Sequence, residues 1–479
     1  MAPAYLAGHF ARHSFDIRCY NEVSDGPLED EHLLAWPDML VLTGLTNSFD
    51  RMLHLTAYAR TRNPRVVVVA GGPAVRMLPT LAGRFFDYAC VADTEDITSV
   101  IRDVFGHSYI AEEPLPRFDL AYWMRGVCYL ETTRYCNFRC AFCALTAEGR
   151  SYQPYDLQYI RRQLESAGKP RKLFFIDNNF YGSDRSHFTA RLEMLKEMRA
   201  AGHFNNWGAL VTSDFFQKDE NLRLARESGC ELLFSGVESF DSDWLRSFSK
   251  VQNVRAPQVE LITKCLDAGI VFIYGLIADV TARSLKEMRR ELDLIVGTHE
   301  IPLPCFITTS IPLLGTPYFF EAVGKGSFLP NTKLRDLDGT TITQTPVDPL
   351  PDVVKFMRDL QSFREFRPRV LKHSIGFVKR YRRKLNPLQL SIGTSMGLML
   401  STQSLSTGSL PFRVKRRAPR TFVSTTEPLD HMYEPAFRVE ARFQHHFNPT
   451  MVTDIKGELH QDILTSGLLD QHSVQAVPA

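Results

Sequence analysis

The chain has 479 residues, of which 44% are hydrophobic and 23% are charged, so it can bury a sizeable core in about two to four domains. A net charge of +2 creates no overall field of the kind that draws a protein to nucleic acid, and nine cysteines over this length are not a disulfide framework. The one apolar run at the start is interrupted by His9 and Arg12, so we expect a cytoplasmic protein without a signal peptide or a transmembrane segment.

Residues 1–106 alternate between strand-like and helical patterns, which predicts an α/β domain. We expect strands at residues 15–20, 39–43, 66–70 and 88–92. The uninterrupted VVVVA run indicates a strand buried on both faces, hence a parallel sheet of the doubly wound, Rossmann-like kind. Gly71 and Gly72 follow that strand at the carboxyl edge, where open α/β sheets bind ligands.

Residues 107–126 contain Pro114 and Pro116 and are predicted to be a linker. Residues 127–320 then alternate between apolar runs and amphipathic helical stretches such as 186–201 and 218–228. The runs lie at 127–131, 173–177, 208–211, 232–236, 271–276 and 306–311. Six such units predict a partial (β/α)6 barrel, whose active site lies at the carboxyl ends of its strands.

Three cysteines follow the first strand of this barrel, in the order Cys136, Cys140 and Cys143, with Phe142 before the last of them. Thiolates at this C-x3-C-x2-C spacing can surround one compact soft-metal centre. A closed zinc site or a closed cluster requires a fourth ligand, and the loop offers none. Three ligands on a four-iron cluster leave one iron open. A structural zinc site and plain buried cysteines are the alternatives.

The loop, placed directly after an apolar strand, resembles the signature loop of radical S-adenosylmethionine (SAM) enzymes. The resemblance implies a [4Fe-4S] cluster on Cys136, Cys140 and Cys143, whose open iron chelates the amino and carboxylate groups of SAM. It also implies that one electron, from a donor such as flavodoxin or ferredoxin, splits the sulfonium and yields a 5'-deoxyadenosyl radical.

Polar residues at other strand ends resemble the SAM contacts of this family. In residues 174–180, Asp177 and Asn178 match the second-strand exit that holds the SAM amino group, although a helix N-cap is the alternative for Asp177. Glu238 matches the fourth-strand G-x-E segment and would contact the ribose or the methionine end of SAM, with a structural salt bridge as the alternative. Ser213, after the third strand, is a further SAM candidate.

The order of strand, Gly-Gly-Pro and helix in residues 1–106 resembles the cobalamin-binding domain that precedes many radical SAM barrels. Residues 311–318 resemble the sixth-strand segment of that class. The resemblance implies a cobalamin contact at Gly71 and Gly72. The usual first strand and phosphate-facing loop are missing, so the domain is expected to be truncated, and a lid that binds no cobalamin stays open as the alternative.

Residues 321–479 are expected to form a small C-terminal α+β region that covers the active site. One or two helices at 351–385 end in the basic run 379–384, which predicts a solvated face, with an anionic or membrane surface as the alternative. An apolar stretch at 388–405 is too polar for a membrane span and suits an interfacial or substrate-covering helix.

The sequence therefore predicts a radical SAM enzyme that acts on a small-molecule metabolite by cobalamin-dependent C-methylation of an unactivated carbon. A cobalamin-independent dehydratase or rearrangement enzyme, for example one that acts on an antibiotic sugar, is the alternative within enzymes. A non-catalytic iron–sulfur or zinc protein is the alternative of another class. No residue is identified as a catalytic acid, a base or a radical quencher.

Overall fold

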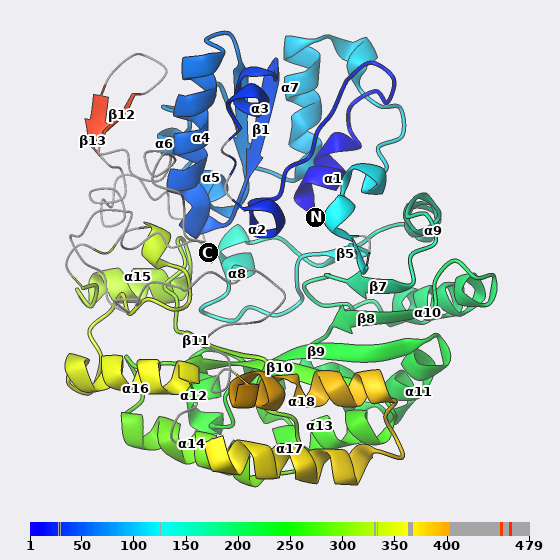
Figure 1. Ribbon diagram of the computed structural model, residues 1–479, viewed down its shortest axis with the longest axis vertical. Coiled ribbons are helices and arrows are strands. Elements are labelled where there is room, and N and C mark those ends of the chain that lie inside the picture. Colours follow the sequence, from blue (N-terminus) through cyan, green and yellow to red (C-terminus); the bar gives the residue numbers. More distant parts are fainter. Residues whose placement is uncertain are drawn as a thin grey trace. The chain divides into compact units, whose positions relative to one another are not determined.

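The computed structural model describes residues 1–402, apart from residues 27, 29, 125, 330, 331, 333 and 363–366, together with 451–453 and 459–461 (Figure 1). The chain divides into two compact units. The first contains Met1–Trp123, Ile311–Thr345 and Pro411–Ala479, and the second contains Met124–Ser310 and Pro346–Leu410. Most of the third segment of the first unit lies outside the described residues.

The first unit is built on a three-stranded parallel sheet in the order β1 (Met39–Thr43), β2 (Val67–Gly71) and β3 (Tyr88–Cys90). Side chains of β2 alternate between two separate cores, since Val68 packs with residues of α4 (Phe49–Arg62) and Val69 with residues of α7 (Ile97–Val104). Both faces of the sheet are therefore covered, as the apolar run in the sequence predicted. The shorter helices are α1 (Ala2–Ala7), α2 (Glu22–Asp25), α3 (Glu31–Ala35), α5 (Pro73–Met77) and α6 (Pro79–Ala82).

Two parts of the first unit differ from the sequence expectation. Residues 15–20 form no strand, because their apolar pattern serves ring packing instead: Phe15 contacts Phe10, Phe105 and Tyr109. The sequence predicts a boundary at residue 320 between the barrel and the C-terminal region. This boundary falls within residues 311–345, which contain α15 (Pro317–Gly324). They pack with the first unit here, since Leu314 and Phe319 enter its core.

The second unit contains a six-stranded parallel sheet whose spatial order follows the chain order. Its strands are β4 (Cys128–Leu130), β7 (Lys172–Phe175), β8 (Asn206–Leu210), β9 (Cys230–Glu238), β10 (Val271–Ala278) and β11 (Phe306–Thr309). The main connecting helices are α9 (Leu157–Ser166), α10 (Arg185–Ala200), α11 (Asp219–Glu227), α13 (Gln258–Asp267) and α14 (Leu285–Gly297). All six expected barrel strands are confirmed, so the carboxyl ends of the strands share one edge.

Side chains at the helix starts explain where these helices begin. Asp156 and Asp184 accept backbone N–H bonds at the first turns of α9 and α10, and Ser284 forms a reciprocal capping box with Glu287 at the start of α14. Capping side chains therefore start α9, α10 and α14, whereas α11 and α13 begin without a side-chain cap.

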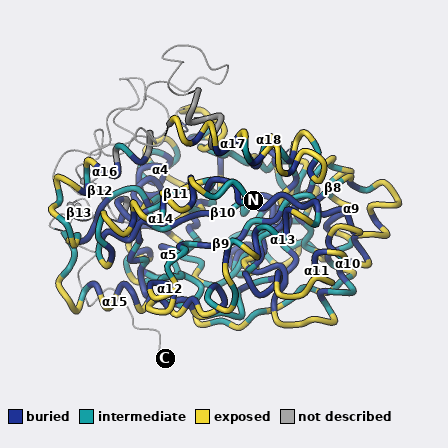
Figure 2. The backbone as a smooth tube through the Cα atoms, turned by 90° about the horizontal axis from the view of Figure 1, so that it is seen from below, coloured by how far each residue is buried: buried dark blue, intermediate teal, exposed yellow. Residues whose placement is uncertain are grey.

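The later part of the second unit consists of α16 (Leu350–Ser362), α17 (Arg367–Tyr381) and α18 (Pro387–Thr402). α17 and α18 pack together through Phe377, whose ring lies against Gly393. In the first unit, β12 (Met451–Thr453) and β13 (Leu459–Gln461) form an antiparallel pair. Within the described residues, no helix is both long enough and apolar enough to cross a membrane. Figure 2 shows how burial varies along the chain.

Candidate functional site

The cysteine loop leaves the carboxyl end of β4, the edge at which barrel chemistry is expected. A short antiparallel pair, β5 (Thr133–Arg134) with β6 (Gln153–Pro154), closes its base. Tyr135 has a φ of 61°, a left-handed conformation that turns the chain directly before Cys136. Cys143 is the N-cap residue of α8 (Ala144–Glu148), so the loop ends at a helix N-terminus.

Cys140 is buried, whereas Cys136 and Cys143 are half-buried, and hydrogen-bond donors face the latter two. Burial raises the pKa of Cys136 to about 11, and the backbone N–H of Phe138 acts in the opposite direction. Burial likewise raises the pKa of Cys143, opposed by the backbone N–H groups of Leu145 and Thr146. The negative charge of neighbouring cysteines in the loop also raises the pKa of Cys136 and of Cys143. Half-buried thiolates aligned with N–H donors suit metal-bound sulfur, whose charge the metal compensates.

The donor set fits a cluster better than a single ion. In the described part of the chain, no three His, Cys, Asp or Glu side chains converge as the ligands of one metal ion would. A [4Fe-4S] cluster makes a different demand, because each thiolate binds an iron at a separate corner. The three thiols of one short loop, with N–H bonds to two of the sulfurs, meet that demand.

A second segment, residues 248–252, lies against the cysteine loop; we call it the backing segment. The N–H of Ala141 donates to the carbonyl of Phe248 at 3.0 Å, and the rings of Phe142 and Phe248 lie 5.7 Å apart. Gln252 is buried, and its Nε2 lies 3.6 Å from Cys140 Sγ, within the range of an N–H···S bond. No motif in the sequence indicated this segment, because it is separated from the loop by about a hundred residues.

Glu238 ends β9 beside the backing segment, in an ion pair with Lys250. Lys250 Nζ lies 2.5 Å from Glu238 Oε1 and 5.5 Å from the centre of the Phe142 ring. The φ of Glu238 is 62°, and a bulge at Val237 shifts the register with β10, so the carboxylate leaves the regular strand. A Cβ on Gly236 would collide with this carboxylate. Both sequence interpretations of Glu238 therefore survive: the salt bridge exists, and the carboxylate, with 15% of its side chain exposed, lies at the strand end.

Asp177 does not lie on an accessible surface. It is fully buried, pairs with Arg191 and accepts the N–H groups of Thr132 at 2.6 Å and Thr133 at 3.1 Å. Burial raises its pKa, while Arg191 and Thr132 act in the opposite direction. Its oxygens are engaged at the base of the cysteine loop and cap no helix, and the SAM contact of Asp177 stays a prediction.

Two other residues of the same strand exit have different positions. Asn178 is exposed, whereas Asn179 is buried and donates from Nδ2 to Asn137 Oδ1, inside the cysteine loop, at 2.7 Å. Asn179 Oδ1 also accepts the N–H of Thr212, at the end of β8, at 3.4 Å. The residue that connects the strand exit to the loop is therefore Asn179. The sequence indicated this segment through Asp177 and Asn178 and not through Asn179, and the SAM contact of Asn178 stays a prediction.

Ser213 lies in 3-10 helix η6 (Ser213–Gln217) and is also buried. Its hydroxyl donates to Asn253 Oδ1 at 2.8 Å, and Asn253 Nδ2 donates to the carbonyls of Gly236 and Val237. Ser213 therefore supports the bulge that carries Glu238. As a direct SAM contact it remains a prediction.

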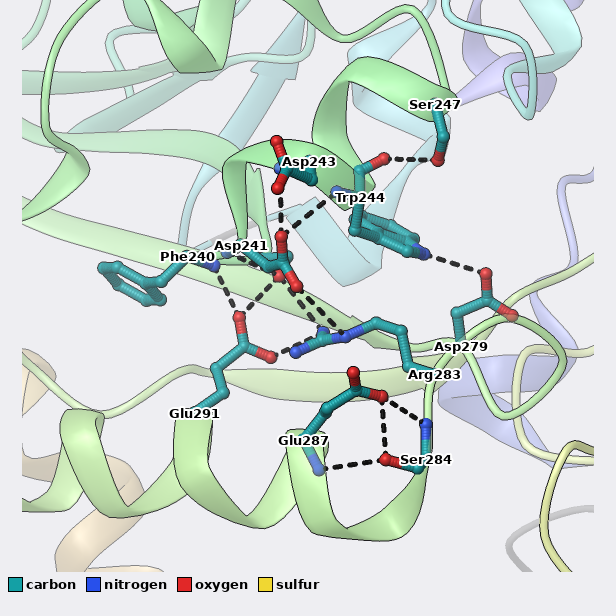
Figure 3. A network of polar contacts seen from close by, with 11 residues as sticks. Phe240, Asp241, Asp243, Trp244, Ser247, Asp279, Arg283, Ser284, Glu287 and Glu291 are labelled. Carbon is teal, nitrogen blue, oxygen red and sulfur yellow. Dashed lines mark hydrogen bonds and ion pairs between the residues drawn. The ribbon is translucent and has the colours of Figure 1, made fainter.

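A polar network fixes the helix that leads to the backing segment, α12 (Ser242–Ser247) (Figure 3). Asp279, at the end of β10, accepts from Trp244 Nε1 at 2.8 Å and from Ser310 Oγ at 2.9 Å. Glu291 of α14 pairs with Arg283 at 2.7 Å. The bonds of Asp279 join α12 and the residue after β11 to the end of β10, which gives the buried Asp279 a structural position.

Gly71 and Gly72, the cobalamin candidates, lie in the first unit, and the structure gives Gly72 a packing role. Its φ is 104°, and a Cβ there would lie 2.5 Å from the carbonyl oxygen of Gly44 at the end of β1. A Cβ on Gly71 would meet only ordinary contacts, at 3.5 Å from the Cys90 oxygen. The loops after β1 and β2 thus approach each other closely, and the cobalamin role stays a prediction.

The family comparison agrees with this geometry. Residues 130–292 match the family model of the Radical SAM superfamily. Residues 130–292 therefore resemble a radical SAM domain. The matched residues include the cysteine loop, the backing segment and Glu238, so the resemblance drawn from the loop is confirmed.

Curated relatives of the radical SAM domain are named as methyltransferases. A bacteriochlorophyllide d C-12(1)-methyltransferase of Chlorobaculum tepidum is 32% identical over 199 residues, which are 40% of this chain and 41% of that protein. A hopanoid C-2 methylase of Rhodopseudomonas palustris is 22% identical over 293 residues, 56% of this chain and 54% of that protein. The chain thus spans about half the length of these relatives or less.

Solved structures share the fold at low identity. The radical SAM methyltransferase TsrM of Kitasatospora setae, with tryptophan and a SAM analogue bound, matches with a TM-score of 0.54 at 14% identity, over 84% of this chain and 95% of that chain. The cobalamin-dependent SAM radical enzyme OxsB, with aqua-cobalamin and SAM bound, matches with a TM-score of 0.53 at 16% identity, over 78% and 64%. The expected α/β architecture is confirmed.

Proposed function

We propose that the protein is a radical SAM enzyme that methylates an unactivated carbon of a small-molecule metabolite. The observation that carries the proposal is the position of the three thiols, on a loop at the carboxyl end of the first strand of a six-stranded parallel sheet. Cys136, Cys140 and Cys143 would hold a [4Fe-4S] cluster, which supplies one electron to SAM when bound. An electron donor such as flavodoxin or ferredoxin would reduce it.

The remaining residues of the site hold and shield this centre. Backbone N–H groups of Phe138, Leu145 and Thr146 face the sulfurs and offset their negative charge. Phe142 and Phe248 place apolar rings beside the loop, which limits access of water to a reactive radical. Glu238, already turned out of β9, would accept hydrogen bonds from SAM while Lys250 balances its charge.

Methyl transfer with cobalamin is the favoured chemistry because curated relatives carry methyltransferase names and because OxsB is described as cobalamin-dependent. The doubly wound sheet of the first unit would hold the cobalamin near the Gly71–Gly72 loop, where open α/β sheets bind ligands. No acid, base or radical quencher is assigned.

Anaerobic reconstitution followed by product analysis tests the proposal. We expect about four irons per chain, lost when the three cysteines are replaced by alanine. With SAM, a reductant and methylcobalamin, the enzyme should release both 5'-deoxyadenosine and S-adenosylhomocysteine. Stoichiometric zinc in place of iron would refute the radical chemistry. Formation of 5'-deoxyadenosine alone, with no effect of cobalamin, would replace methylation by the dehydratase or rearrangement alternative.

A further inference from the structure

Helix α17 has one face buried in its own unit and an apolar stripe on the opposite face. Val370, Phe377 and Tyr381 are buried. Leu371, Ile375 and Val378 follow one another at positions i, i+4 and i+7, and they are 53%, 47% and 37% exposed. Single exposed aliphatic residues are common on proteins, but three in register on one helix face form a continuous surface.

The residues around this stripe are basic. Residues 367–384 contain eight Lys and Arg and no Asp or Glu. Exposed Lys372, Lys379 and Arg382 lie within about one helical turn of the stripe, on the same side of α17. Three of the other basic residues reach back to carboxylates of their own unit: Arg369 to Asp293, Arg380 to Glu300 and Lys384 to Asp267. The outward face therefore combines aliphatic side chains with uncompensated positive charge.

We propose that the outward face of α17 docks on an anionic lipid surface. An amphipathic helix binds a membrane by inserting its apolar stripe below the headgroups while flanking Lys and Arg meet anionic lipids. A protein partner fits less well, because lysine is depleted from protein interfaces. A purely solvated face, which the basic run alone suggests, does not explain the three aligned aliphatic residues. Within the described residues no helix can cross a membrane, so the contact would be peripheral.

Docking of α17 on a lipid surface does not depend on the cluster or on the reaction. It concerns the place where the enzyme works, and it favours a substrate that is dissolved in or bound at a membrane. Failure of the docking would leave the radical SAM proposal intact, and failure of the radical chemistry would leave the docking intact.

Vesicle sedimentation tests the docking with the full-length protein. Vesicles of phosphatidylcholine are compared with vesicles in which phosphatidylglycerol replaces about a third of the lipid. We expect co-sedimentation with the anionic vesicles that weakens as salt is added, since surface electrostatics are screened. The variant Leu371→Ser, Ile375→Ser, Val378→Ser and the variant Lys372→Glu, Lys379→Glu, Arg382→Glu should each bind about tenfold or more weakly.

A matched control replaces three exposed aliphatic residues elsewhere, Val23, Leu45 and Val347, which are 84%, 67% and 58% exposed, by serine. It should bind vesicles like the wild type. Circular dichroism establishes whether each variant is folded. If the triple serine variant is not folded, the single variant Ile375→Ser replaces it in the vesicle assay. Absence of wild-type binding to anionic vesicles, or binding as strong as that of the wild type by both α17 variants, would overturn the proposal. The proposal would also be overturned if the wild type formed a dimer without binding vesicles and the triple serine variant were a monomer. A second copy of the chain would then cover the face.

Discussion

Asp177 and Arg191 form an ion pair without exposed surface, with Asp177 Oδ2 and Arg191 Nη1 3.6 Å apart. Arg191 Nη1 also donates to Thr132 Oγ1 at 2.7 Å, and Asp177 accepts the N–H of Thr132. The pair thereby joins α10 and the end of β7 to the chain that enters the cysteine loop. The base of the cysteine loop is thus held by the Asp177–Arg191 ion pair, whose charges are not screened by solvent.

Replacing Asp177 by Asn should cost about 3–5 kcal/mol of unfolding free energy, because it leaves the Arg191 charge buried without its partner. Denaturant unfolding measures this loss. Asp184→Asn, at the N-cap of the helix that carries Arg191, is a matched control and should change stability little, because asparagine caps a helix as well as aspartate does. A loss for Asp177→Asn no greater than for the control would contradict the anchoring role.

Gln252→Leu should lower the reduction potential of the reconstituted cluster while its iron content is kept. An N–H bond to a ligand sulfur stabilises the added negative charge of the reduced cluster, and leucine cannot donate one. A redox titration followed by electron paramagnetic resonance measures the change. The control is Gln258→Leu, which removes a buried amide that bonds Asn253 and no cysteine. Equal reduction potentials in Gln252→Leu and Gln258→Leu would argue against a hydrogen bond from Gln252 to Cys140 Sγ.

Glu238→Gln should weaken SAM binding about tenfold to a hundredfold with the cluster intact, because a charged acceptor at the strand end is lost. Equilibrium dialysis with labelled SAM gives the affinity, and iron analysis reports the cluster. Glu260→Gln, at the start of α13, should bind SAM like the wild type. If Glu238→Gln also keeps wild-type affinity, the carboxylate serves only its salt bridge with Lys250.

Gly72→Ala should destabilise the first unit by about 1–3 kcal/mol, since alanine meets a φ of 104° and a carbonyl oxygen 2.5 Å away. Gly71→Ala is the neighbouring control and should change stability little, because its Cβ has room. Thermal unfolding without added cobalamin compares the two. Equal melting temperatures would show that the loops after β1 and β2 can separate without cost.

Stability should fall with acid through His373. Its ring lies 5.6 Å from that of His299, and Nδ1 lies 3.2 Å from the carbonyl oxygen of Val296. Burial lowers the pKa of His373 below its ordinary 6.5; His299 lowers it further, while Val296 and Glu300 oppose the shift. The unfolded chain therefore binds the proton more tightly, so this contribution is complete above the ordinary pKa and is lost as the pH falls through it.

Urea unfolding between about pH 5 and pH 8 measures the slope, which should flatten in His373→Leu. An unchanged slope in His373→Leu would assign the acid sensitivity to other groups.

Much of the fold could be read from local patterns. The six barrel strands appeared as short apolar runs at regular spacing, and the run at β2 correctly predicted a strand covered on both sides. Residues 15–20 show the limit of this reasoning. Phe15 gives the segment a strand-like pattern, but the same apolar residues can be buried by aromatic packing or by pairing with a strand. Only the presence of a neighbouring strand distinguishes the two cases.

The sequence by itself determined the position of the cysteine loop and the resemblance to radical SAM enzymes, because cysteine spacing and strand periodicity are encoded within a few residues. Only the tertiary structure decided which polar groups surround that loop. It buried Asp177, turned Asn179 toward Asn137 and brought Gln252 to Cys140 across more than a hundred residues. Among the described residues, it also leaves the stripe on α17 exposed. Burial and long-range proximity arise from packing between elements, and no local pattern specifies which side chains will meet.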